Sequence, residues 1–112
     1  EVSNTPLQAL TLLNDAVFVE AAQALGRQAA GSPGTVGSRA RELFRRCLTR
    51  PPTAQEAALL ERFYETQKRR FETKELDAAA VAGPGEGDPN ERAAWTAVAR
   101  SLLNLDETMT RN

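Results

Sequence analysis

The stretch PPTAQE, residues 51–56, marks the end of one helix and the start of another within six residues. A residue that precedes proline is pushed out of the α region, so a helix arriving from the N-terminal side should end near Arg50. Thr53 and Glu56 have the spacing of a capping box, in which the threonine hydroxyl accepts from the Glu56 amide and the glutamate accepts from the Thr53 amide. This stretch therefore predicts two helices joined by a short turn.

Apolar residues on both sides of this turn recur with the period of an α-helix. Upstream they fall at i, i+3, i+4, i+7 and i+8: Ala40, Leu43, Phe44, Cys47 and Leu48. Downstream the capped helix runs to about Glu72 and carries Leu59, Leu60, Phe63, Tyr64 and Phe71. The two segments predict amphipathic helices that each bury one face.

The first thirty residues predict helix but leave its continuity open. Asn4 or Thr5 can cap, and Pro6 suits the first helical position. Asn14 favours a C-cap and Asp15 an N-cap, so we expect two helices, 6–13 and 16–29, that meet at a tight corner. The alternative is a single kinked helix. In an unbroken helix one face carries Leu7, Leu10, Leu13, Val17, Phe18, Ala21 and Leu25.

Two stretches rich in glycine, residues 31–37 and 83–91, predict loops. Between them, residues 73–82 predict a weaker helix whose modest apolar face is Leu76, Ala79 and Ala80. In the second loop Asp88 is the expected cap, Pro89 the first helical residue and Glu91 the reciprocal partner. Asn104 is a candidate cap for the end of the last helix. One face of this helix carries Ala94, Trp95, Val98, Leu102 and Leu105.

Together these segments predict an all-α fold, an orthogonal bundle of five to six helices with no sheet. No segment alternates convincingly at period two, as a half-buried strand would. Alanine is abundant and β-branched residues are scarce, a composition that loses little side-chain freedom in helices. A chain of 112 residues is long enough for one core, so we expect a single domain over residues 1–112.

The composition argues against most catalytic chemistry. The chain has no histidine, which removes the commonest general base and metal ligand. Its one cysteine, Cys47, lies on an apolar helix face and predicts a packed thiol. Glu61 and Glu65 are one turn apart and could hold a hard cation, but a charged outer face explains them better. We therefore expect no enzyme activity and predict no catalytic, cofactor-binding or metal-binding residue in this chain.

The candidate interaction residues are basic and aromatic: Trp95, Tyr64, Arg39, Arg46 and Arg50. The three arginines form one stripe beside a helix–turn–helix outline, but a net charge of −1 does not favour nucleic acid. A contact with a neighbouring domain fits them better. Trp95 and Tyr64 are expected in the core, whereas an exposed Trp95 would form a platform for a carbohydrate or another ligand. No apolar run approaches the roughly 20 residues that cross a bilayer, so we expect no membrane insertion by this segment.

Three ordered blocks cover nearly the whole chain: NTPLQALTLLNDAVFVEAAQAL, ARELFRRCLTRPPTAQE and ERAAWTAVARSLLNLDETMTR. They resemble the C-terminal domain of unknown function of large cytochrome-associated proteins from planctomycetes and related bacteria. One departure is Ala16, because the family usually has proline after LLND. The chain has no CxxCH motif, so any haem would belong to another part of the parent protein.

The resemblance implies a context rather than a reaction. It implies that the chain is the C-terminal fragment of a larger exported protein, periplasmic or at the cell surface. We expect a non-catalytic helical module that packs on the preceding domains or on another protein, with the first block as the docking or linking helix. Helix-end caps would be Asn14, Asp15, Asn104 and Asp106. The alternative is a part of an extracellular polysaccharide- or polymer-degrading or redox system whose catalytic groups lie upstream.

Overall fold

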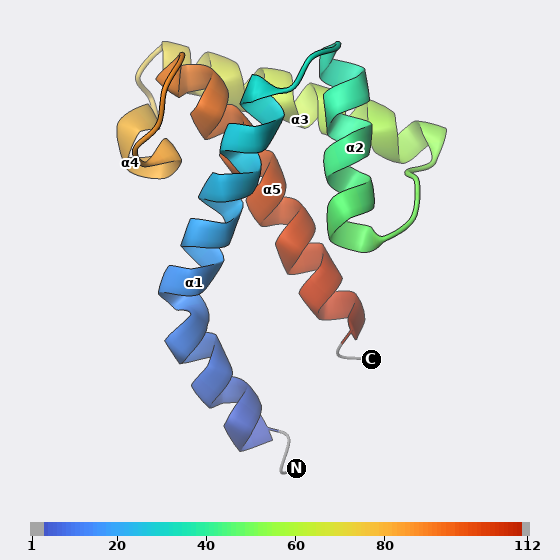
Figure 1. Cartoon of the computed structure of the whole chain (residues 1–112), viewed down its shortest axis with the longest axis vertical. Helices are drawn as coiled ribbons and strands as arrows, with labels where there is room; N and C mark the ends of the chain where they lie inside the picture. Colours follow the sequence, from blue (N-terminus) through green and yellow to red (C-terminus); the bar gives the residue numbers. More distant parts are fainter. Residues whose placement is uncertain (1–3, 111–112) are drawn as a thin grey trace.

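A computed structural model of the chain describes the backbone of residues 4–110 and the side chains of residues 16–105 (Figure 1). Within these residues it contains no strand and five helices: α1 (Asn4–Gly31), α2 (Val36–Leu48), α3 (Ala54–Glu72), α4 (Ala78–Ala82) and α5 (Pro89–Thr110). The predicted all-α class is confirmed, and the orthogonal arrangement of the bundle stays a prediction. No helix in the described part of the chain is long and apolar enough to cross a membrane.

α1 is one helix that continues through Asn14 and Asp15, so the expected corner and the caps at these two residues are wrong. The sequence supplies a physical reason, because no proline interrupts residues 7–32 and Ala16, directly after the two polar residues, is the best helix former. The proposed caps at Asn4 or Thr5 lie outside the described side chains.

The buried face of α1 consists of small residues. Ala22, Gly26 and Ala29 are buried, whereas Val17 is 57% exposed and Ala21 is also exposed. The predicted apolar face is therefore wrong at these two positions, while Phe18 and Leu25 are half-buried. Leu7, Leu10 and Leu13 have no described side chains. Small residues allow the α1 backbone to approach its neighbour closely.

α2 begins at Val36, four residues before the predicted apolar pattern does. Thr35 accepts from the Ser38 amide (3.1 Å) and Ser38 accepts from the Thr35 amide (3.0 Å), which makes a second capping box. The expected loop over 31–37 is therefore too long, because its last residues are helical. α2 ends at Leu48, where Thr49 takes a left-handed conformation with φ 58°.

α3 has the predicted capping box. The Thr53 hydroxyl accepts from the Glu56 amide (3.1 Å), and the Glu56 carboxylate accepts from the Thr53 amide (2.8 Å). After Glu72 the chain turns at Lys74, which has φ 66°. The helix expected over 73–82 is therefore wrong in its first half.

α4 covers only Ala78–Ala82, and the Asp77 side chain caps it by accepting from the Ala80 amide (3.3 Å). Ala79 and Ala80 are exposed, so the predicted apolar face is wrong at both positions. Val81 and Ala82 face the core instead, and Leu76 packs against it from the preceding turn.

α5 is the central helix and packs against each of the other four, most extensively against α1. It begins at Pro89 as predicted, and the Asp88 carboxylate accepts from the Asn90 amide (3.0 Å); the reciprocal bond from Glu91 stays a prediction. It continues through Asn104 and Asp106, so the end caps predicted at these residues are wrong. Of the predicted inner face, Ala94, Trp95, Val98 and Leu102 are buried, but Leu105 is 45% exposed.

Figure 1 shows α1 and α5 crossing in the upper part of the molecule and diverging toward the lower part. α2, α3 and α4 surround the upper part, which holds the buried cluster. The fold therefore combines a packed body with two diverging helix ends.

Candidate functional site

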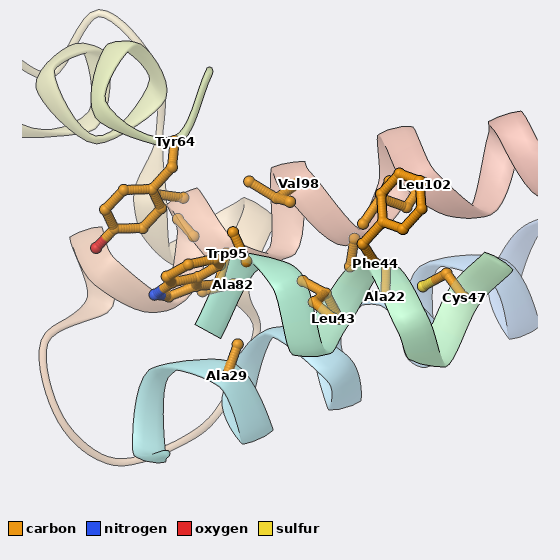
Figure 2. Close-up of a cluster of buried hydrophobic side chains, with 14 of the residues drawn as sticks. Ala22, Ala29, Leu43, Phe44, Cys47, Tyr64, Ala82, Trp95, Val98 and Leu102 are labelled. Carbon is orange, nitrogen blue, oxygen red and sulfur yellow. The ribbon is translucent and has the colours of Figure 1, made fainter. Parts of the chain in front are cut away.

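The two candidate aromatic residues lie together in the core. Trp95 is fully buried and Tyr64 is 2% exposed, and their ring centroids are 4.2 Å apart with the planes tilted by 32°. Figure 2 shows the Tyr64 hydroxyl and the Trp95 indole nitrogen pointing toward the same side of this cluster. In this arrangement neither ring offers a face to an external carbohydrate, so the packing interpretation describes both residues.

Burial affects the hydroxyl of Tyr64 and the indole nitrogen of Trp95 in different ways. Desolvation is the main cause that raises the pKa of Tyr64 to about 12, and the nearby carboxylates of Glu91 and Glu65 add to it. The buried indole Nε1 of Trp95 has no hydrogen-bond partner among the described residues. An unsatisfied buried donor costs about 1–3 kcal/mol, so this contact is stabilised by apolar area rather than by polar bonds.

The predicted arginine stripe is divided between two places. Arg50 leaves α2 and forms two bonds of 2.9 Å to the Glu56 carboxylate at the start of α3. Its guanidinium also lies 4.9 Å from the centre of the Phe44 ring. The Arg50 bond, aided by the Thr53 amide, lowers the pKa of Glu56 to about 2. Arg50 therefore holds the junction between two helices.

Arg39 and Arg46 instead line a groove of about 560 Å³ between the C-terminal turns of α1 and one side of α2. Three apolar residues, Leu25, Ala29 and Leu43, form part of its wall. Its charged side chains are Arg27, Arg39, Arg46 and Glu42. The sequence pattern identified Arg39 and Arg46, but it did not show that they meet Arg27 across a groove.

The hydroxyl groups in this groove already have local partners. Ser38 is part of the α2 capping box, and Ser32 donates to the Gln28 carbonyl (2.6 Å). Arg46 donates to the side chain of Gln28 and lies 3.5 Å from the carboxylate of Glu42. Arg39 has no ion pair within the described residues, and its buried Nε has no acceptor there. Of the three guanidinium groups in the groove, that of Arg39 has neither a hydrogen bond nor an ion pair within the described residues.

The stretch GPGEGD, residues 83–88 of the predicted loop over 83–91, is held to the body by side chains of α1 and α5. Arg92 donates to the Gly83 carbonyl (2.9 Å) and Arg27 to the Pro84 carbonyl (3.4 Å). Just before it, Gln23 donates to the Val81 carbonyl (3.1 Å). Partners 57 and 58 residues apart cannot be read from local sequence, so this attachment was missed.

The remaining sequence candidates occupy structural positions. Cys47 is buried in the core cluster, as its place on an apolar face predicted. Among the described side chains, no three or more cysteine, aspartate or glutamate residues gather in a group able to hold a metal ion. The groove is thus the best-defined candidate site in the part of the chain that the structure covers.

Comparison with known proteins gives a family but no function. Residues 1–64 match the model of a family described as "Protein of unknown function (DUF1553)". No curated protein and no solved structure matches the chain. The matched residues contain α1 and α2, the two helices that form the groove, together with the α2–α3 junction.

Proposed function

This chain belongs to the DUF1553 family of proteins of unknown function, and we propose that it is a non-catalytic helical module that packs onto preceding domains of a longer protein. We further propose that this protein is exported, cytochrome-associated and of planctomycete type, with any haem bound outside this chain. The blocks quoted above support this context through their resemblance to such proteins. In the proposed role the module closes the longer chain by burying exposed apolar side chains of α1 and α5.

The exposure of large apolar side chains on α1 and α5 supports the docking role. Val17 on α1 is 57% exposed and Leu105 on α5 is 45% exposed, and these two helices diverge in the lower part of Figure 1. Full burial of such a side chain is worth about 1.5–3 kcal/mol. A partner that covers both positions would gain that free energy without any change in the packed body.

The polar side chains support a structural rather than a catalytic role. Thr35, Ser38, Thr53 and Glu56 cap helices, and Arg50 joins α2 to α3. Each of these groups stabilises a helix end or a turn. The candidate residues therefore explain chain geometry without requiring a substrate.

Thiol labelling tests the docking of α1 and α5. We would place single cysteines at Val17→Cys and Leu105→Cys in the full-length protein and in the chain alone, and measure the rate of maleimide labelling. Leu59→Cys is the matched control, because Leu59 is 57% exposed on α3. Buried Cys47 supplies an internal reference for a slow thiol.

If the module docks as proposed, we expect maleimide to label Val17→Cys and Leu105→Cys quickly in the chain alone. In the full-length protein the labelling should be at least about tenfold slower. Leu59→Cys should react at similar rates in both. Equal rates for all three cysteines in the full-length protein would overturn the docking role. Protection of Leu59→Cys alone would overturn it as well, because the docked face would then be α3.

A further inference from the structure

We propose that the groove between α1 and α2 binds a small organic anion that combines a carboxylate with a compact apolar body. The groove is a different surface from the one that contains Val17 and Leu105, so this proposal can be tested independently of the docking role. It rests on the charge of the groove, on the unused donors of Arg39 and on the apolar wall beside them.

The charge of the groove opposes that of the whole chain. Arg27, Arg39 and Arg46 contribute three positive charges against the one negative charge of Glu42, which leaves a local net charge of +2. The chain as a whole carries −1. A local excess of guanidinium groups attracts an anion, and the planar guanidinium matches a carboxylate through two parallel hydrogen bonds.

Arg39 is the residue expected to bind the carboxylate. Its side chain is half-buried, its Nε lacks an acceptor, and no ion pair within the described residues neutralises it. Burying a charged donor without a partner is unfavourable. An anionic ligand that accepts from the accessible end of the guanidinium would remove the uncompensated charge.

Arg46 can assist because its ion pair with Glu42 is weak. The side chains of Arg46 and Glu42 are 52% and 65% exposed, and ion pairs as exposed as this are worth about 0–1 kcal/mol. A ligand carboxylate can therefore replace Glu42 at little cost. Arg27, whose bond to the Pro84 carbonyl is long at 3.4 Å, faces the same groove from α1.

The apolar wall of the groove indicates that the ligand has an apolar body beside its carboxylate. Leu25, Ala29 and Leu43 lie beside the arginines, and the hydroxyls of Ser32 and Ser38 are already bonded within the chain. A volume of about 560 Å³ lies within the usual range of small-molecule sites. The groove thus fits an apolar body with one anionic group better than it fits a sugar, which needs several free polar partners.

Benzoate is a suitable probe, with benzamide as its neutral analogue and sulfate as an anion without an apolar body. We would titrate each into the chain and follow the methyl resonances of Leu25 and Leu43 and the Nε–H resonance of Arg39 by NMR. Benzoate should give saturable shifts at all three residues. Arg39→Gln should weaken benzoate binding by about ten- to a hundredfold, the loss expected for one charge-assisted hydrogen bond.

Arg45→Gln is the matched control, because Arg45 lies on the exposed face of α2 and does not line the groove. It should leave benzoate affinity unchanged within about twofold. Titration of the unaltered chain keeps the test valid even if Arg39→Gln does not fold. Three results would overturn the proposal: no saturable shift with benzoate, equal binding of benzamide, or binding of sulfate as strong as that of benzoate.

Discussion

The central helix α5 meets α1 and α3 in two different ways. Against α1 the contact is between the backbone of Gly26 and Thr96: a Cβ added at Gly26 would overlap the Thr96 hydroxyl and would lie 2.9 Å from the Thr96 backbone nitrogen. Against α3 the contact is between two large rings, Tyr64 and Trp95, with centroids 4.2 Å apart. The first contact depends on a missing side chain, and the second depends on two large ones.

The difference shows that one core can be destabilised by an added atom at one crossing and by a removed ring at another. At the α1–α5 crossing an added atom must push two helices apart, because the opposing atoms include backbone. At the α3–α5 crossing a removed ring leaves a cavity that the rigid helices cannot close. Mutations at the two crossings can therefore separate overpacking from loss of packing within one small molecule.

Trp95→Ala should have the largest effect. Removing a fully buried indole should lower the free energy of unfolding by about 3–5 kcal/mol. Trp95 is the chain's only tryptophan, so unfolding should be followed by circular dichroism in denaturant. Leu59→Ala on the exposed side of α3 is the control and should change stability little. A loss below about 1 kcal/mol for Trp95→Ala would show that the ring contact does not stabilise the core as argued here.

Gly26→Ala should come next, with a loss of about 1–3 kcal/mol from overpacking, even though alanine in a helix is otherwise favoured over glycine by about 1 kcal/mol. The control is Gly31→Ala at the end of the same helix, where an added Cβ would meet nothing within 4 Å. It should be neutral or stabilising. Equal stabilisation by both substitutions would contradict the close approach at Gly26.

A double-mutant cycle sharpens this result. Thr96→Ala removes the hydroxyl nearest to the added Cβ, but it leaves the Thr96 backbone atoms at 2.9 and 3.0 Å. It also removes the bond from the hydroxyl to the Arg92 carbonyl (2.7 Å). Gly26→Ala in a Thr96→Ala background should therefore be less destabilising than alone, by about 0.5–2 kcal/mol. No coupling would mean that the hydroxyl is not the obstacle.

Features fixed by neighbouring residues were predictable. The Thr53–Glu56 box, the start of α5 at Pro89 and the inward face of Trp95, Val98 and Leu102 depend on spacings within a few turns. The box at Thr35 was missed because its third residue is Ser38, a less familiar partner than glutamate. Asn14 and Asp15 are typical cap residues and therefore predict a break that α1 does not have. Ala16, which follows them, favours a continuous helix.

Features fixed by distant residues were not predictable. A glycine within a helix suggests local weakness, and only the position of Thr96 shows that Gly26 permits a close crossing. Arg39 and Arg46 were identified as candidates, but their groove requires the end of α1 to lie beside α2. Arg50 was assigned to the same stripe, yet the helix ends before it and its side chain turns to Glu56. Periodicity gives the face of a helix and does not give its neighbour.

Tyr64→Phe should have a small effect at neutral pH and a distinct one in alkali. The pKa of Tyr64 is raised from 10.0 to about 12, so the folded state favours the neutral phenol. That contribution to stability is present below pH 10 and is lost as the pH rises from 10 to 12. Tyr64→Phe should remove the alkaline loss while it changes stability at pH 7 by less than about 1 kcal/mol.

Tyr64 is the chain's only tyrosine, so an ultraviolet titration reports on it directly. Ionisation at the ordinary pKa in the folded chain would contradict the burial of its hydroxyl. The same titration on the Gly26→Ala variant shows whether disturbing the α1–α5 crossing also opens the aromatic contact. We expect the aromatic contact to stay closed in Gly26→Ala, because the two contacts lie on different helix pairs.

Glu56→Gln should give the smallest change, at the opposite end of the pH scale and outside both crossings. The bonds from Arg50 and the Thr53 amide lower the pKa of Glu56 from 4.5 to about 2. Its ionised form therefore stabilises the folded chain above pH 4.5, and this contribution is lost as the pH falls toward 2. Glu56→Gln should be slightly less stable than the unaltered chain at pH 7 and equal to it near pH 2, as measured by denaturant unfolding at each pH.

Glu42→Gln, at the exposed pair with Arg46, is the control and should show little difference at pH 7. A difference that persisted at pH 2 would mean that residue 56 acts through its shape in the cap rather than through its charge. The Gly26–Thr96 contact contains no titratable group, so Gly26→Ala should keep the same stability difference across both pH ranges.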